Sequence, residues 1–193
     1  METEQRLYEA ANSGDRQAMR RLYDRYVGWA MATGLRYIPE RADAEDVVQD
    51  AFVKVLTHLN QFHYRGEGSL KAWVGRIVVN RALDFLKERR MWQGTLVEAA
   101  MAEENDLVAE EEPEVEGVPP DVLLELIGQL PAGYRTVLNL FVFEGMSHKE
   151  IATQLGIKPD TSASQFFRAK SMLGRLIREK KAMKEGLNKQ ERR

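Results

Sequence analysis

The sequence contains no cysteine and only three histidines. The lack of cysteine excludes disulfide bonds, thiolate zinc sites and thiol catalysis. The histidines His58, His63 and His148 do not have the spacing of a pair of metal ligands on one helix. We therefore expect a protein that holds no metal and needs no cofactor.

Long apolar runs are also missing, because no segment approaches the roughly eighteen apolar residues of a membrane-spanning helix. Residues 1–5 lack the basic and apolar parts of a secretion signal. We expect a cytoplasmic protein with no membrane insertion. Apolar residues recur at steps of three and four in several long stretches, and almost nothing alternates as a strand does. This periodicity predicts an all-α fold.

Charge is distributed unevenly along the chain, although the net charge is only -2. Residues 1–90 carry 15 basic and 13 acidic side chains, residues 91–119 carry none and nine, and residues 120–193 carry 13 and eight. An acidic stretch without helical periodicity is typical of a linker. The predicted organisation is a helical domain over 1–90, an acidic flexible linker over 91–120, a second helical domain over 121–185 and a basic tail over 186–193.

Caps and apolar periodicity divide the first domain into helices. The expected helices cover residues 4–11, 15–37 with Asp15 as the N-cap, 43–59 and 70–90, with a loop over 61–69. In the third helix, Asp46, Gln49 and Asp50 lie opposite the apolar stripe. The charge of this face fits a protein-binding surface, and it fits an ordinary solvated helix face as well.

The second domain contains a segment, residues 147–157, with the layout of a helix-turn-helix. Ser147 and Glu150 form a predicted capping box, and Gly156 supplies the left-handed turn residue between the two helices. The same pattern fits a plain helical hairpin with a glycine turn. The expected helices of this domain cover 122–130, 133–143, 147–155 and about 160–184. The last helix would present to the DNA major groove Thr161, Ser164, Gln165 and Arg168. Available for contacts to phosphates are Lys170, Arg175 and Arg178.

Two regions of the chain, in the same order, resemble the sigma-70 superfamily of RNA polymerase sigma factors in its extracytoplasmic-function (ECF) branch. Residues 43–52 resemble the family's region 2.2, and residues 73–86 resemble regions 2.3 and 2.4. Residues 130–137 and 144–157 resemble regions 4.1 and 4.2. The resemblance implies an alternative sigma factor, without enzymatic activity of its own, that binds core RNA polymerase and directs promoter-specific initiation.

The resemblance also implies sites for the partners. Asp46, Gln49 and Asp50 are expected to bind the β′ coiled coil of the polymerase, where complementary charge would set the register. The second domain is expected to read the -35 element and to meet the β flap, and an anti-sigma factor is expected as inhibitor. The first domain is expected to capture the -10 element and to aid opening. Aromatic and cationic groups hold unstacked bases, and the residues expected at this site are Phe62, Tyr64, Arg65, Arg76, Asn80 and Lys87.

Some of these residues have a second interpretation. Phe62 and Trp73 fit packing in a core equally well. Three residues of the last helix depart from the family pattern. The family commonly has Val where this chain has Ser162 and a basic residue where it has Ala163, and Arg is frequent at the position of Gln165. Fewer cations weaken a phosphate clamp, so another DNA-targeting partner could supplement this helix. The acidic linker could occupy the nucleic-acid path of the polymerase or serve as a simple tether.

Two functions other than a sigma factor also fit parts of the sequence. The chain could be a helix-turn-helix regulator that binds DNA without polymerase, with the first domain as a dimerisation or ligand module. It could also be a metal-dependent helical hydrolase, since Glu45, Asp46 and Asp50 are carboxylates of the kind that hold magnesium. No second acidic helix offers the partners that a two-metal site requires.

Overall fold

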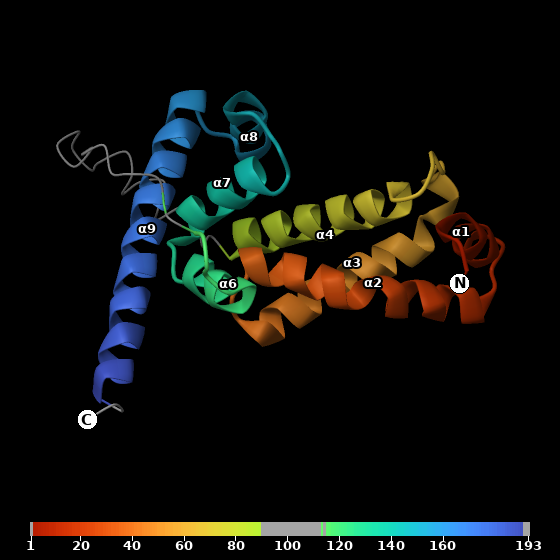
Figure 1. Ribbon diagram of the computed structural model, residues 1–193. Coiled ribbons are helices and arrows are strands. Elements are labelled where there is room, and N and C mark those ends of the chain that lie inside the picture. Colours follow the sequence, from red (N-terminus) through yellow and green to blue (C-terminus); the bar gives the residue numbers. More distant parts are fainter. Residues whose placement is uncertain (1, 90–112, 114, 191–193) are drawn as a thin grey trace. The chain divides into compact units, whose positions relative to one another are not determined.

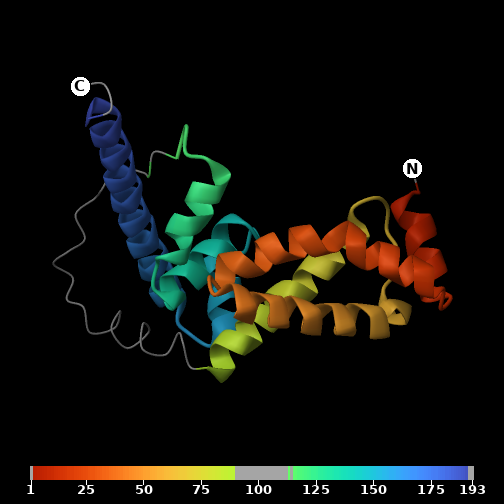
Figure 2. The same ribbon diagram turned by 90° about the horizontal axis from the view of Figure 1, so that it is seen from below.

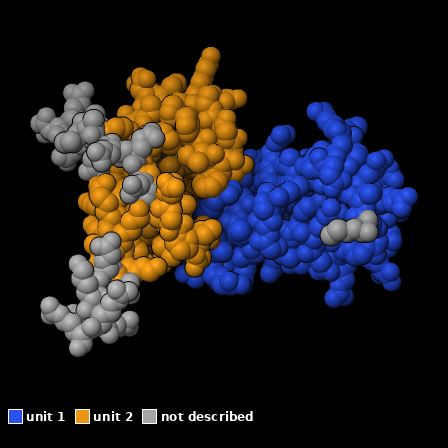
Figure 3. Space-filling view, viewed as in Figure 1, with its two compact units in different colours: residues 1–89 blue, residues 90–193 orange. Residues whose placement is uncertain are grey.

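The computed structural model describes residues 2–89, 113 and 115–190, and for 185–190 the backbone alone. Helices are the regular elements of these residues, and no strand occurs among them, which confirms the all-α fold. The chain divides into two compact units, Met1–Arg89 (unit 1) and Arg90–Arg193 (unit 2), coloured separately in Figure 3. Most of the linker predicted over 91–120, and the last three residues of the predicted tail, lie outside the described residues.

Unit 1 is a bundle in which three long helices run side by side in alternating directions, as Figures 1 and 2 show. The shorter first helix of the chain packs against the helix that follows it, which is the first of the three long ones. The elements are α1 (Glu4–Asn12), α2 (Arg16–Tyr37), α3 (Arg41–Thr57), the 3-10 helix η1 (Leu59–Gln61) and α4 (Ser69–Glu88).

Local sequence sets the start of α2 as predicted, because the Asp15 carboxylate accepts hydrogen bonds from the backbone N–H groups of Gln17 and Ala18. The start of α3 differs from the prediction: the helix begins at Arg41 instead of Asp43, directly after Glu40. Arg41 then pairs with Glu45 one turn later, at 2.8 Å. The sequence analysis also did not predict η1.

The core of unit 1 is made of the apolar stripes that the periodicity indicated. Each fully buried large apolar side chain stabilises the fold by roughly 1.5–3 kcal/mol through its removal from water. Fully or almost fully buried members include Leu7, Leu22, Tyr26, Val48, Phe52, Leu70, Val74 and Val78.

Unit 2 is built around α9 (Pro159–Gln190), which is much longer than α6 (Pro120–Gly128), α7 (Ala132–Val142) and α8 (His148–Leu155) (Figure 1). All three shorter helices contact α9. The helix continues to Gln190, past the predicted end near Lys184 and into the predicted tail. The core lies between the helices and contains Leu126, Ile127, Leu130, Leu138, Ala169, Leu173 and Ile177.

A buried arginine joins α6 to α7. The Nη1 atom of Arg135 donates to the carbonyl oxygens of Gly128 and Leu130, at 2.8 and 2.7 Å. These carbonyls lie at the end of α6, where a helix leaves acceptors without an internal partner. Burial lowers the pKa of Arg135 to about 10, so the guanidinium is still charged at neutral pH.

Along the described part of the chain, none of the helices combines the length and the apolar character needed to cross a membrane.

Candidate functional site

The face predicted on α3 is present: Asp46, Gln49 and Asp50 are exposed, on the side away from the core. Arg81 on α4 pairs with Asp50 at 3.0 Å and also with Glu88 at 3.4 Å. A polar pocket of about 370 Å³ includes all five of these residues in its lining. Arg81 therefore fixes one of the predicted carboxylates, a role that sequence reasoning missed because the partners lie on different helices.

The same face of α3 carries an exposed apolar residue. Val53 has 64% of its surface exposed, and it lies three and four positions after Asp50 and Gln49. Residues at this spacing share one side of a helix. The sequence analysis did not single it out, although a valine outside the apolar stripe was a usable signal.

The loop between η1 and α4 forms a second pocket, of about 300 Å³, which brings together three predicted residues, Phe62, Arg65 and Arg76. Phe62 is only 8% exposed, and its ring centroid lies 5.1 Å from those of both Tyr8 and Trp73. Phe62 therefore packs as a core side chain and offers little open ring surface for stacking, while its contact with the -10 element stays a prediction. The ring is part of the pocket wall because its neighbours cover both sides.

The other predicted residues of unit 1 surround this pocket. Tyr64 is half-buried and stacks on Tyr8 with 6.2 Å between ring centroids. Partial burial and the nearby Glu67 carboxylate raise the pKa of Tyr64, so its hydroxyl is protonated at neutral pH. Asn80 and Lys87 are exposed on α4. Their spacing from Arg76, four and eleven residues, places them on the same side of the helix as the pocket-lining arginine.

The helix-turn-helix of unit 2 has both of its predicted local features. The Ser147 hydroxyl accepts from the Glu150 backbone N–H at 3.3 Å, and the Glu150 carboxylate accepts from the Ser147 N–H at 2.8 Å. These hydrogen bonds from Ser147 lower the pKa of Glu150. Gly156 ends α8 with a φ of +69°, a conformation that other L-residues rarely adopt. The capping box and the turn glycine are confirmed.

The first half of α9 separates the predicted DNA-facing residues. Thr161, Ser164, Arg168 and Arg175 follow at steps of three, four and seven, so they share one side of the helix. Ser164 and Arg175 are exposed, whereas Thr161 and Arg168 are half-buried. Gln165 is 0% exposed, and the prediction that it faces DNA is wrong, because its spacing continues the buried stripe.

Lys170 lies on another side of α9. It follows Arg168 by two positions, which is about 200° around the helix, and its ammonium group lies 5.4 Å from the centroid of the Phe166 ring. The prediction that Lys170 joins the DNA-facing set is therefore not supported by its position. Lys149 and Lys158, which the sequence analysis did not name, are exposed within the helix-turn-helix itself.

Comparison with known proteins gives two family matches. Residues 22–91 match the family model "Sigma-70 region 2", and residues 121–173 match "Sigma-70, region 4". The RNA polymerase sigma-H factor of Pseudomonas aeruginosa is 31% identical, over 91% of this chain and 94% of that protein. The ECF RNA polymerase sigma-E factor of Haemophilus influenzae is 31% identical, over 89% and 93%.

Two further proteins are similar to this chain over most of its length. The ECF RNA polymerase sigma-E factor of Escherichia coli K12 is 30% identical, over 89% of this chain and 92% of that protein. A solved structure, described as CnrH in complex with the cytosolic domain of CnrY, is 28% identical over 90% of this chain and 96% of that one, with a TM-score of 0.45.

The chain belongs to the sigma-70 family of RNA polymerase sigma factors, in its extracytoplasmic-function branch. It is an alternative sigma factor, which directs promoter-specific transcription through core RNA polymerase and promoter DNA. No comparison favours the stand-alone regulator or the hydrolase. Within the described residues, no group of three or more histidine, aspartate or glutamate side chains is placed to hold a metal ion.

Proposed function

We propose that this sigma factor binds the polymerase through α3 and α6–α9, captures the -10 element with the loop before α4, and contacts the -35 element with one side of α9. The observation that carries the proposal is the pocket of about 300 Å³ at the loop, which has aromatic and cationic side chains in its lining. The α3 face and the side of α9 lie on other helices, and each has exposed side chains.

The α3 face suits a basic, partly apolar partner such as the β′ coiled coil. Asp46 and Asp50 supply negative charge, and Val53 supplies an apolar group among them. Complementary charge mainly sets specificity and association rate, whereas apolar contacts at the centre of an interface supply affinity. Arg81 holds the Asp50 side chain ready for that contact.

The loop pocket suits an unstacked base of the -10 element. An extruded base is held by stacking on aromatic side chains and by hydrogen bonds to its edges. Trp73 and His63 provide rings in the pocket, while Arg65 and Arg76 provide donors. Asn80 and Lys87 then continue along α4, where the phosphates of the same strand would lie.

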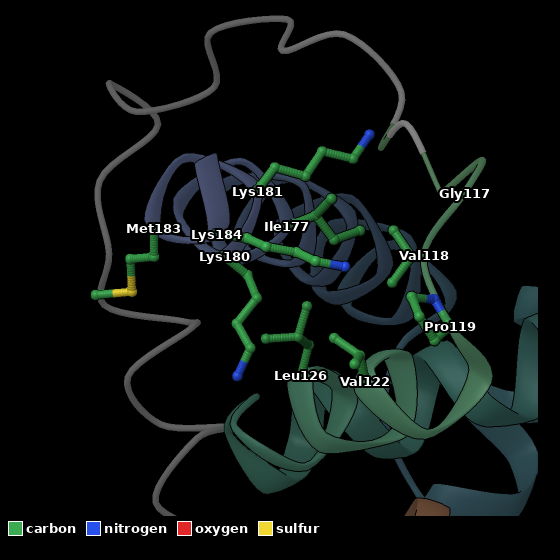
Figure 4. Close-up of a pocket in the computed structure, with 10 residues that line it drawn as sticks. All are labelled: Gly117, Val118, Pro119, Val122, Leu126, Ile177, Lys180, Lys181, Met183 and Lys184. Atoms are coloured by element: carbon green, nitrogen blue, oxygen red, sulfur yellow. The ribbon is translucent and has the colours of Figure 1, made fainter. Parts of the chain in front are cut away.

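A groove in unit 2 suits a helix with an apolar side and acidic flanks, such as the β flap would supply. It has a volume of about 380 Å³, and Figure 4 shows Val122 and Leu126 on α6 opposite Ile177 on α9. Lys180 and Lys184 are at its edge, so an acidic partner would gain from charge complementarity. Met183 is 69% exposed beside the groove, which adds apolar surface to be covered.

We further propose a cytoplasmic location. We also propose an anti-sigma factor that covers the α3 face and the unit 2 groove, because an inhibitor must compete with polymerase for these surfaces. A second DNA-targeting partner is also proposed, since burial of Gln165 and the position of Lys170 leave α9 with few groups that face DNA.

Charge reversal tests the docking surface. The double variant Asp46→Arg and Asp50→Arg should bind core polymerase about tenfold or more weakly, because like charges would face each other across the interface. The matched control is Glu9→Arg with Asp24→Arg, two exposed acids on other helices. Equal binding of both double variants in a titration of labelled protein with core enzyme would remove α3 from the account.

Arg168 and Lys170, two of the cationic residues of α9, form a matched pair of variants to test the -35 contact. In holoenzyme, Arg168→Ala should lower promoter affinity by about 1–3 kcal/mol if the side chain reads a base, and by less if it touches phosphate. Lys170→Ala should have a smaller effect because it lies on another side of the helix. If the two variants show the same loss, or none, α9 does not contact DNA as proposed.

A further inference from the structure

The loop that carries the candidate -10 pocket is held at its beginning by α1. The hydroxyl of Tyr8 donates to the carbonyl oxygen of Phe62 at 2.7 Å. The Tyr8 ring also meets the Phe62 ring edge-on at 5.1 Å and stacks on Tyr64 at 6.2 Å, with 13° between the ring planes. One side chain of α1 thus fixes both the backbone and an aromatic ring of the loop.

The end of the loop is held by a second residue of α1. Glu4 is 2% exposed, and its carboxylate accepts from the Tyr26 hydroxyl at 2.8 Å and from the Leu70 backbone N–H at 3.0 Å. Burial, together with the Glu4 carboxylate, raises the pKa of Tyr26, so its hydroxyl stays a donor. The carboxylate therefore has a partner on α2 and another on α4.

The contact with Leu70 replaces a missing helix cap. Leu70 lies in the first turn of α4, whose N–H groups have no partner within the helix. The N-cap of α4 is Gly68, at φ +87°, and it provides no side-chain hydrogen bond. Glu4 supplies that acceptor from 66 positions earlier in the chain, and its negative charge is favourable at a helix N-terminus.

We propose that α1 positions the -10 pocket, with Glu4 and Tyr8 as its positioning residues. The inference rests on the proposed function of the loop and goes beyond it, since α1 lies outside residues 22–91, which match region 2 of the family. The loop contains Gly66 and Gly68, both with positive φ, and a free loop of this kind loses entropy when it binds. Fixing it in advance removes that cost from DNA capture.

The test uses holoenzyme and fork-junction DNA built from a promoter that this sigma factor transcribes. The non-template strand is single-stranded across the -10 element, and each of its bases is replaced in turn by an abasic site. The discrimination at a position is the ratio of the Kd for abasic DNA to the Kd for intact DNA. The variants are Tyr8→Phe, which keeps the ring and removes the hydroxyl, and Glu4→Gln, which removes the charge. The control is Glu9→Gln, on the exposed side of α1.

Wild-type holoenzyme should discriminate strongly at one or two bases. Tyr8→Phe and Glu4→Gln should each reduce that ratio by about 3- to 10-fold, the range expected for one lost hydrogen bond, with core binding unchanged and Glu9→Gln like wild type. If the ratio in the variants is unchanged, including the case in which they bind intact and abasic DNA equally more weakly, the inference is overturned.

The result also separates this inference from the proposed function. If wild type discriminates and the variants do so equally well, the pocket stands and the role of α1 falls. If wild type shows no discrimination at any position, the pocket is wrong and the inference falls with it. Thermal unfolding of each variant is measured first, and if Glu4→Gln does not fold, Tyr8→Phe alone decides.

Discussion

The two units organise their candidate DNA-contacting segments in opposite ways. In unit 1 the loop before α4 is held by Tyr8 and Glu4, which are 54 and 66 positions from their partners. In unit 2 the helix-turn-helix is held locally, by a capping box whose two residues are three positions apart and by a hydrogen bond between His148 and Ser162, 14 positions apart. A local motif can therefore be recognised from sequence, whereas the order of the loop depends on a distant helix.

Buried polar side chains occur in the interiors of both units. The buried carboxylate of Glu4 has hydrogen-bond partners on two helices. Among the described residues, neither the amide nitrogen nor the amide oxygen of buried Gln165 has a hydrogen-bond partner, and the hydroxyl of Thr136 has none either. An unsatisfied buried polar group costs about 1–3 kcal/mol, so the Gln165 amide and the Thr136 hydroxyl are each expected to reduce the stability of unit 2.

The largest expected effect comes from breaking the long-range cap. Glu4→Ala should destabilise unit 1 by about 2–4 kcal/mol, because it leaves the Tyr26 hydroxyl and the Leu70 N–H buried without an acceptor. Hydrogen exchange of the α4 amides measures this, with Glu9→Ala as control. Exchange rates that match those of the control would show that the loop does not depend on α1.

Gln165→Leu should stabilise unit 2. An apolar side chain of similar size removes the unsatisfied amide, so unit 2 should gain about 1–2 kcal/mol of stability. Thermal unfolding compares it with Ser164→Ala, a change on the exposed side of the same helix. A loss of stability in Gln165→Leu would contradict this expectation, since it would mean that the buried amide is satisfied.

Breaking the local cap should have a smaller effect than breaking the long-range one. Ser147→Ala removes the N-cap acceptor of α8 and should cost about 1 kcal/mol. The loss should be confined to unit 2, as measured by hydrogen exchange, while Thr153→Ala on the same helix serves as the control. A loss as large as that of Glu4→Ala would contradict the proposed ranking.

The smallest effect is the pH dependence of the same capping box. The pKa of Glu150 is lowered by its hydrogen bonds with Ser147, so the stabilisation is present above the ordinary value of 4.5 and is lost as the pH falls through the lowered one. The stability difference between wild type and Glu150→Gln should therefore be constant at neutral pH and shrink only as the pH falls below 4.5. A difference that stays constant in acid would show that the charge of Glu150 is not involved.

Sequence reasoning succeeded where a feature depends on neighbours in the chain. The Asp15 cap, the Ser147 and Glu150 box and the Gly156 turn were all predicted, because each requires particular residue types within a few positions. The polar face of α3 followed from helical periodicity alone. Local rules were enough for these elements because a helix satisfies its backbone within itself.

Sequence reasoning failed where the burial of a residue depends on which distant parts of the chain pack against it. Gln165 was predicted to face DNA but is fully buried, and the rings of Tyr8 and Trp73 pack against Phe62 and leave it little exposed surface. Glu4 gave no signal, since an acid in the first turn of a short helix is normally solvated. Only the fold brings Leu70 and Tyr26 to it.

The measurement that tests the central claim most directly is run-off transcription with bacterial core polymerase across a library of genomic promoters. The wild-type chain should produce transcripts from a defined subset that shares two sequence elements, and Asp46→Arg with Asp50→Arg should abolish them. If adding the protein to an active core enzyme does not change transcription, and the protein alone binds specific DNA tightly, the assignment is contradicted and a stand-alone regulator is favoured.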